Sequence, residues 1–518
     1  MELKIRLFFV IASLFSCLVY SQSELQIEIR DSETSEQISY ATVRFKGTNR
    51  GLIADYNGQF RIPSSQINDI PVLLITSIGY ESLEVITSEI TLNTLTIVKM
   101  KPQIESLDAV IINSNTKKET RQYIKESRKM LAYGIVYRAV NSIKTNLNNK
   151  SHSYIGYYRD YQIVDSKYYN LNEGIVEQFD AGILTNKVFG KSNSAALYSF
   201  KQNSDFETKE LYSIEYNDST KFVDNADIKG FGGNELSILN VHNPIRNYDK
   251  QSFSYVYRLN KEFLQNHEFR KDEIQFIDNE PIIRIRFKNK SKLTSYSHRV
   301  VGDINISLKD FAIHSFNYYV YDYDKRNPLF NIKIEYRAQN ENMYLNYITF
   351  NNRFTIADLD VFKEEKVIFN NKYYKYFEVT FNSDFDEKTL KKSRFKIKHN
   401  DRRILIKSLV VEDKRTIRLY IQDYDEDLIN IKKDSMKNIE FTIKNINDKE
   451  GREIYIPVKR IGYQFREYFV QEVFDSNTPN ENLKLIFKNK SLKKSTINSN
   501  SGNENYIINS PLQNRKME

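Results

Sequence analysis

The sequence contains few of the residues that most often carry enzyme chemistry. Among 518 residues there are one cysteine, no tryptophan and six histidines, with only 16 glycines and 9 prolines. A single cysteine excludes an intrachain disulfide and a cysteine-built zinc site. The low glycine and proline content excludes a collagen-like or proline-rich chain. Because 40% of the residues are hydrophobic and 28% are charged, most of the chain is expected to fold around buried cores.

Motifs of the common catalytic centres are missing as well. No histidine is followed by glutamate three residues later, as a zinc carboxypeptidase site requires, and there is no Gly-x-Ser-x-Gly elbow or phosphate-binding loop. The acidic run 423–427 lacks the glycine and glutamate spacing of a calcium loop. We therefore predict no catalytic residue, no cofactor and no metal site, and a protein that is not an enzyme. A hydrolase with carboxylates that the sequence does not identify remains the alternative. The histidines are His152, His242, His267, His298, His314 and His399.

The net charge of +9 does not indicate a nucleic-acid partner. The 76 lysines and arginines are interspersed with 67 acidic residues, whereas nucleic-acid-binding proteins concentrate basic residues on one face. The excess of lysine and arginine over acidic residues therefore predicts a solvated, basic protein surface.

The N-terminal segment, 1–21, has the pattern of a cleavable signal peptide. Lys4 and Arg6 precede an apolar run, 7–20, which is too short to span a bilayer as a helix. We expect cleavage between Ser21 and Gln22; lipid attachment at Cys17 is the alternative. No later run reaches about 18 apolar residues, so no transmembrane helix is expected after signal removal.

Residues 24–102 have the pattern of a small β domain. Apolar and polar residues alternate from Leu25 to Arg30, as in a half-buried strand. Asp55, Asn57 and Gly58 predict a tight hairpin turn in which Gly58 adopts a positive φ, and Gly79 ends a later strand.

The two runs SYATVRFKGTNRGLIADYNGQFRI and LLITSIGYESLEV resemble the carboxypeptidase-regulatory-like domain that is common in exported proteins of Bacteroidetes type. The resemblance implies a seven-stranded, transthyretin-like β-sandwich that serves as an accessory module and has no peptidase chemistry. The matching residues are Ala41, Thr42, Val43, Gly47, Thr48, Asp55, Asn57, Gly58, Phe60, Ile78, Gly79 and Tyr80.

The rest of the chain predicts a mainly β, multidomain protein. Residues 103–153 are expected to form a linker strand and one long amphipathic helix near 118–147, because apolar residues recur there at three- and four-residue steps. Residues 154–370 alternate as a large antiparallel sheet and weakly resemble the curved sheets of outer-membrane lipoprotein carriers. Residues 373–474 resemble bacterial Ig-like β domains. Residues 476–518 are rich in Asn, Ser and Lys and are expected to be a disordered tail.

Three functions fit this organisation. The first is a non-catalytic binding or assembly protein of the cell envelope, exported and either periplasmic or associated with the outer membrane or cell surface. Its partner would be an envelope protein, a glycan or a lipid. The second is a lipid- or lipoprotein-handling protein that uses the large sheet as an apolar cup, and the third is the hydrolase. Tyrosine pairs such as Tyr157–Tyr158, Tyr168–Tyr169 and Tyr373–Tyr374 are expected in strand cores, although exposed tyrosines could bind peptide or glycan.

Overall fold

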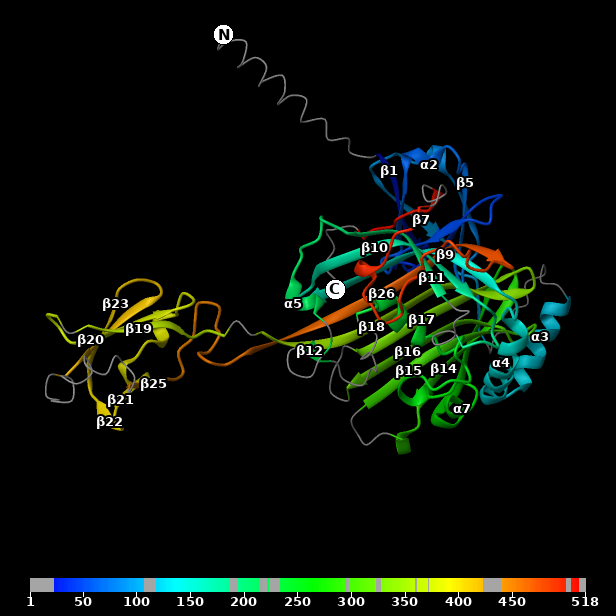
Figure 1. Cartoon of the computed structure of the whole chain (residues 1–518). Coiled ribbons are helices and arrows are strands. Elements are labelled where there is room, and N and C mark those ends of the chain that lie inside the picture. The colour runs from blue at the N-terminus through cyan, green and yellow to red at the C-terminus, as the bar shows by residue number, and fades with distance from the viewer. Residues whose placement is uncertain are drawn as a thin grey trace, which may run out of the picture. The chain divides into compact units, whose positions relative to one another are not determined.

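The chain forms two compact units (Figure 1). Unit 1 comprises Met1–Tyr216, Val223–Phe354 and Gly462–Glu518, and unit 2 comprises Asn217–Phe222 with Thr355–Ile461. The computed structural model describes residues 23–106, 118–186, 194–214, 216, 221–222, 233–293, 298–322, 328–358, 361–370, 372–422, 439–499 and 505–511. The expected signal peptide therefore lies outside the described residues. In the described part of the chain, no helix has the length and apolar character needed to cross a membrane.

The N-terminal part of unit 1 is a seven-stranded β-sandwich. One sheet has the order β4-β1-β7 and the other the order β3-β2-β5-β6. The alternation seen in the sequence places Leu25, Ile27 and Ile29 of β1 in the core between the sheets, where each is 0% exposed. The strands are β1 (Glu24–Asp31), β2 (Thr42–Phe45), β3 (Gly51–Ile53), β4 (Gln59–Pro63), β5 (Val72–Thr76), β6 (Leu83–Ile86) and β7 (Leu95–Met100), and the short helix α2 spans Ser64–Ile67.

The predicted hairpin around Gly58 is wrong in one respect. Strand β3 pairs with β2, whereas β4 pairs with β1, so the turn between them connects the two sheets. The residues of the turn specify its tight backbone, but the partner of each flanking strand depends on residues far away in the sequence.

The second part of unit 1 contains 11 strands of a 12-stranded sheet, hereafter the large sheet, as predicted for the middle region; the twelfth strand, β12, belongs to unit 2. Eleven strands follow the order β11-β10-β9-β26-β18-β17-β16-β15-β14-β13-β8, and β12 pairs with β18. Its strands are β8 (Ile104–Ser106), β9 (His152–Val164), β10 (Lys167–Asp180), β11 (Ser194–Gln202), β12 (Lys221–Phe222), β13 (His267–Ile277), β14 (Glu280–Asn289), β15 (His298–Ser307), β16 (Ile313–Asp322), β17 (Pro328–Gln339), β18 (Asn342–Asp358) and β26 (Val458–Asp475).

The predicted long helix is two helices, α3 (Lys118–Lys129) and α4 (Ala132–Asn146). The break has a tertiary cause. The Lys271 ammonium group donates to the backbone carbonyls of Ser127 and Arg128, in the last turn of α3, and of Met130, just after it, at 3.0–3.3 Å. Leu131 then adopts an extended conformation before α4 begins.

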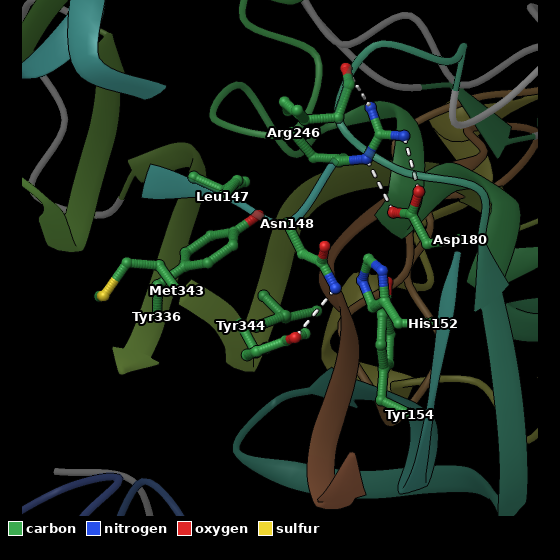
Figure 2. Close-up of a pocket in the computed structure, with 11 residues that line it drawn as sticks. Leu147, Asn148, His152, Tyr154, Asp180, Arg246, Tyr336, Met343 and Tyr344 are labelled. Atoms are coloured by element: carbon green, nitrogen blue, oxygen red, sulfur yellow. Dashed lines mark hydrogen bonds and ion pairs between the residues drawn. The ribbon is translucent and has the colours of Figure 1, made fainter. Parts of the chain in front are cut away.

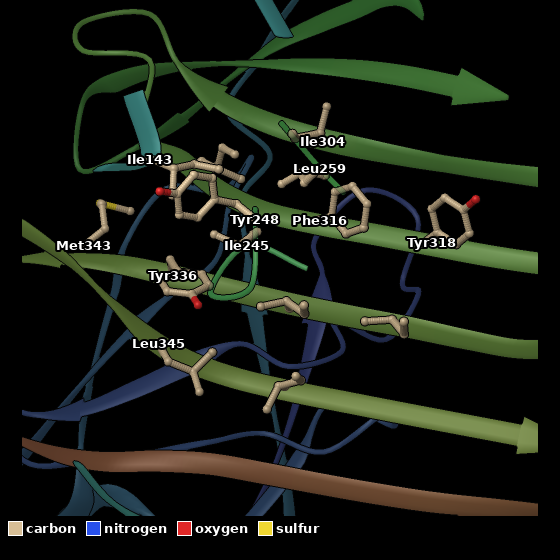
Figure 3. Packing of buried hydrophobic residues seen from close by; sticks show 14 of the residues in the cluster. Ile143, Ile245, Tyr248, Leu259, Ile304, Phe316, Tyr318, Tyr336, Met343 and Leu345 are labelled. Carbon is tan, nitrogen blue, oxygen red and sulfur yellow. The ribbon is translucent and has the colours of Figure 1, made fainter. Parts of the chain in front are cut away.

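Helices and loops fill one face of the large sheet with their own side chains. Ile143 of α4 and the loop residues Ile245, Tyr248 and Leu259 pack in one cluster with Phe316 on the sheet (Figure 3). Because side chains alternate along a strand, the next residues point to the opposite face, on which the N-terminal sandwich packs. The remaining helices of unit 1 are α5 (Glu210–Ser213), α6 (Glu235–Val241) and α7 (Glu262–Asn266).

Unit 2 contains two small sheets that share one hydrophobic core. The predicted boundaries 373–474 are wrong at both ends: the unit begins at Thr355, and β26 pairs with β9 of the large sheet from Gly462 onward. The alternation of apolar and polar residues in β26 suits a strand of unit 2 as well as a strand of the large sheet, so the sequence pattern did not reveal that β26 pairs with β9. The strands are β19 (Glu364–Asn370), β20 (Tyr376–Phe381), β21 (Phe395–His399), β22 (Arg402–Ile404), β23 (Ile406–Val411), β24 (Thr416–Ile421) and β25 (Ile439–Ile443).

The prediction of a disordered tail is also wrong for residues 476–499 and 505–511. Leu485 and Ile497 form bridges to β11, the edge strand of the large sheet, and Leu492 is 3% exposed. Ile507 is 1% exposed within the core of the N-terminal sandwich. The tail has too few apolar residues for a core of its own, but its buried residues complete cores built by other segments, and the bridges cover a sheet edge.

Candidate functional site

The predicted turn residues lie at the contact between the N-terminal sandwich and the large sheet. The Asp55 carboxylate accepts hydrogen bonds from the backbone N–H groups of Asn57 and Gln59, each at 2.9 Å. Burial raises the pKa of Asp55 to about 6, although the nearby Arg159 guanidinium acts in the opposite direction. Gly79 lies at φ +89°, and its N–H donates to the carbonyl of Phe276 on β13 at 3.1 Å. The turn at Gly79 therefore joins the sandwich to the large sheet, whereas the hydrogen bonds of Asp55 fix the shape of its own turn.

Replacing Gly58 should destabilise unit 1. Gly58 lies at φ +69°, and a Cβ there would approach the carbonyl oxygens of Ile29 and Ile38 to 2.8 and 2.9 Å. We expect Gly58→Ala to lower the thermal midpoint and to cost more than about 1 kcal/mol, with Gly58→Val costing more. Gly47→Ala is the matched control, because Gly47 has φ +85° and a Cβ added there would have nothing within 4 Å. Equal shifts for the two alanine variants would contradict the role of the two carbonyls.

A buried ion pair lies beside the turn. The Arg159 guanidinium on β9 donates to the Glu467 carboxylate on β26, and both side chains are at most 2% exposed. The Tyr40 hydroxyl of the sandwich lies 3.5 Å from Glu467, and its ring stacks on Tyr347 at 4.9 Å. These contacts attach the sandwich to the large sheet. The four side chains do not include a nucleophile hydrogen-bonded to a general base, as a catalytic site would require.

A second buried cluster surrounds a small pocket on the helix-covered face (Figure 2). Arg246 pairs with both oxygens of Asp180 at 2.7 Å and also donates to the carbonyls of Gly182 and Thr185. Asn148 donates to the Tyr344 hydroxyl at 2.9 Å. The space between these side chains has room for about one water molecule, so their role is structural. We call Asp180, Arg246, Asn148 and Tyr344 the clasp.

A third buried group contains an acid with a strongly perturbed pKa. Asp160 on β9 accepts hydrogen bonds from Tyr158 and Asn172 at 2.8 and 3.1 Å. Burial, assisted by the charge of Glu235, raises the pKa of Asp160 to about 7. Arg466 bonds to Glu235 and, at 2.6 Å, to Asn352. These side chains satisfy one another inside the core.

The raised pKa of Asp160 predicts a pH-dependent stability. An unfolded aspartate has a pKa near 3.9, so the folded state binds the proton more tightly. The resulting stabilisation is fully present below about pH 4 and is lost as the pH rises through 7, by at most about 1.4 kcal/mol per pH unit. Asp160→Asn should therefore weaken the decline in stability between about pH 4 and 7, measured by urea unfolding. An unchanged pH profile would contradict this assignment.

Two of the buried histidines, His242 and His267, are residues of the hydrophobic core of unit 1. Burial lowers the pKa of His242 and of His267 to about 4, so both are neutral near pH 7. His242 stacks on Phe350 at 4.0 Å, and His267 lies within hydrogen-bond distance of the Tyr318 hydroxyl, at 3.1 Å. Among the described residues, no group of three or more histidine, cysteine or acidic side chains could hold a metal ion.

The tyrosine pairs divide into buried and exposed ones. Tyr157 and Tyr158 are at most 1% exposed and point to opposite faces of the large sheet. In contrast, Tyr373 and Tyr374 of unit 2 are 84% and 71% exposed. Of these two pairs, Tyr373–Tyr374 is therefore the one whose rings a binding partner can reach.

Two further tyrosines extend the exposed pair into an aromatic surface. The ring of Tyr420 on β24 lies 6.3 Å from the ring of Tyr374 and 5.2 Å from that of Tyr376 on β20. The Arg418 guanidinium lies 5.0 Å over the Tyr376 ring, and Asn370 donates to the Tyr376 hydroxyl at 2.9 Å. We call Tyr374, Tyr376 and Tyr420, together with their sequence neighbour Tyr373, the tyrosine face of unit 2.

Sequence reasoning missed Tyr376 and Tyr420 as members of this face. A signal for both was nevertheless present, because each alternates with buried residues of its strand, such as Phe377 and Leu419. Alternation of this kind places the tyrosine on the outer side of its strand.

Comparison with known proteins identifies the N-terminal module. Residues 28–112 match the family model of the CarboxypepD_reg-like domain, which confirms the predicted domain and agrees with the observed β-sandwich, whereas the Bacteroidetes type stays a prediction. No curated protein and no solved structure matches the chain. The Ig-like character of unit 2 stays a prediction, and the cleavage site at Ser21 and Gln22 lies outside the described residues.

Proposed function

We propose that the protein is an exported, non-catalytic binding or assembly protein of the cell envelope, and that the tyrosine face of unit 2 is its binding surface. The exposed face carries the proposal. Clustered aromatic rings on a sheet surface are costly to leave in water, and tyrosine is enriched where proteins bind partners.

The chemistry of the tyrosine face suits an envelope partner such as a surface protein or a glycan. The rings offer apolar area, and their hydroxyl groups offer hydrogen bonds at its edge. Arg418 is paired with Glu378 and Glu412, so it holds the Tyr376 ring in place from the side of the protein. The matched N-terminal domain supports a non-catalytic role, because such domains are regulatory modules. Lipid handling receives less support, since side chains of the protein itself fill the helix-covered face of the large sheet (Figure 3).

Binding is tested by co-sedimentation of the full chain with insoluble cell-envelope fragments. We expect the wild-type chain to sediment with the fragments and the double variant Tyr374→Ser/Tyr420→Ser to lose about 10-fold or more in affinity. Tyr133→Ser is the matched control, because Tyr133 of unit 1 is 50% exposed and lies outside the tyrosine face. Fragments treated with protease distinguish a protein partner from a glycan. Equal sedimentation of all three chains would contradict the proposal.

Export is tested separately by expressing the full sequence in a bacterium and fractionating the cells. The proposal expects a product in the periplasmic or outer-membrane fraction that begins at Gln22. A cytosolic product that retains residues 1–21 would contradict export without affecting the binding test.

A further inference from the structure

The C-terminal segment, residues 505–511, occupies its site in the manner of a bound peptide. Its buried and half-buried residues alternate, with Ile507, Asn509 and Pro511 buried. One wall of the site comes from β3 and β4 of the N-terminal sandwich, and the other comes from β9, β10 and β26 of the large sheet.

Ile507 is the anchor of this segment. Its side chain completes the core of the sandwich and is 1% exposed. The side-chain amide of Gln471, itself 3% exposed, pairs with the backbone of Ile507 in both directions: Nε2 donates to the carbonyl at 2.6 Å, and Oε1 accepts from the N–H at 2.9 Å. The side-chain amide of Gln471 therefore makes the same pair of hydrogen bonds to this backbone as a neighbouring β-strand would make.

Asn509 is bound through both of its polar ends. Its side-chain oxygen accepts from the backbone N–H of Arg61 at 3.2 Å, and its amide nitrogen donates to the carbonyl of Ile53 at 3.3 Å. Its backbone carbonyl accepts from the buried Arg159 at 3.1 Å. These contacts discriminate in favour of asparagine, because a side chain without both a donor and an acceptor leaves buried backbone groups unpaired.

Ser510 completes the recognition. Its hydroxyl donates to the Glu173 carboxylate at 2.6 Å, and its carbonyl accepts from Arg61 Nε at 3.0 Å. Near the start of the segment, the Tyr506 hydroxyl donates to Glu472 at 2.8 Å. Side chains on both walls therefore contact the segment along its length.

We propose that this site is a peptide-recognition site for an extended partner segment with the pattern aromatic–Ile–x–Asn–Ser, and that the C-terminal segment is its resident competitor. The contacts are side-chain and backbone contacts that a separate peptide could make equally well. A tethered segment acts at an effective concentration in the millimolar range, so it excludes a partner until it is displaced.

The experiment uses the full chain with a specific protease site placed within residues 500–504. A fluorescein-labelled peptide of residues 504–513 is added before and after cleavage, and binding is followed by fluorescence anisotropy. After cleavage and removal of the cut segment by gel filtration, we expect the peptide to bind at least about 100-fold more tightly than it binds the uncut chain. Peptides with Ile507→Asp or Asn509→Ala should bind at least about 10-fold more weakly than the native sequence.

Two controls show whether the peptide binds at the proposed site of an intact fold. Circular dichroism and the thermal midpoint of the cut chain, measured while the segment is still bound, establish that cleavage leaves the fold intact. In the cut chain, Gln471→Ala should weaken peptide binding, whereas Glu84→Gln on the exposed side of β6 should not. The proposal is overturned if the cut segment never exchanges, or if the altered peptides bind as tightly as the native one.

Discussion

Replacement of Arg246 by methionine is expected to lower the free energy of unfolding by about 3–5 kcal/mol. The substitution leaves Asp180 as a charge that is 3% exposed and has lost its bidentate partner. It also removes the donors that Arg246 directs to the carbonyls of Gly182, Ile183 and Thr185, so the loop after β10 loses these three hydrogen bonds. Figure 2 shows the bonds of Arg246 to Asp180.

Urea unfolding followed by the near-ultraviolet signal of tyrosine measures this effect, since the chain has no tryptophan. The double variant Asp180→Asn/Arg246→Met should recover part of the loss, because it removes the uncompensated charge. Arg258→Met is the control, since the pair between Arg258 and Glu262 is partly exposed to solvent. A loss for Arg246→Met no larger than that of the control would show that the clasp does not stabilise the fold.

The second large effect is expected for Glu467→Gln. The glutamine keeps the shape of the side chain but leaves the buried Arg159 without its compensating charge, at a cost of about 3–5 kcal/mol. The aromatic rings around Arg159, such as Phe469 at 5.2 Å, offset only part of this cost.

Glu84→Gln is the matched control for this prediction, because Glu84 pairs with Lys46 at 2.7 Å and both side chains are 52% exposed. It should change the stability by less than about 1 kcal/mol. Thermal unfolding of the two variants measures the difference. Similar midpoints for Glu467→Gln and Glu84→Gln would mean that the junction between the sandwich and the large sheet does not depend on the buried pair.

Local patterns in the sequence predicted the elements of this fold well. Alternation from Leu25 to Ile29 indicated a strand, and the set of turn residues around Gly58 indicated the CarboxypepD_reg-like domain. The large antiparallel sheet followed from the same alternation. These features depend on residues that are close in sequence, so they are readable without knowledge of tertiary contacts.

What the sequence did not reveal depends on distant contacts. The break between α3 and α4 is stabilised by Lys271, which lies far downstream on β13, and β26 finds its partner in β9, far upstream. The C-terminal segment is ordered because the side chain of Ile507 packs into the core of the sandwich, which is formed by residues far away in the sequence. For the candidate site, the sequence showed the Tyr373–Tyr374 pair, but its expected place in a strand core was wrong, and its completion by Tyr420 required the pairing of β20 with β24.

Hydrogen–deuterium exchange of the full chain, with and without cell-envelope fragments, tests the central claim most directly. The account predicts slower exchange in β20 and β24, the strands that carry Tyr376 and Tyr420, and no change in the helices α3 and α4 of unit 1. The slower exchange should disappear in the Tyr374→Ser/Tyr420→Ser variant. Protection confined to unit 1, or protection that persists in that variant, would contradict the assignment of the tyrosine face as the binding surface.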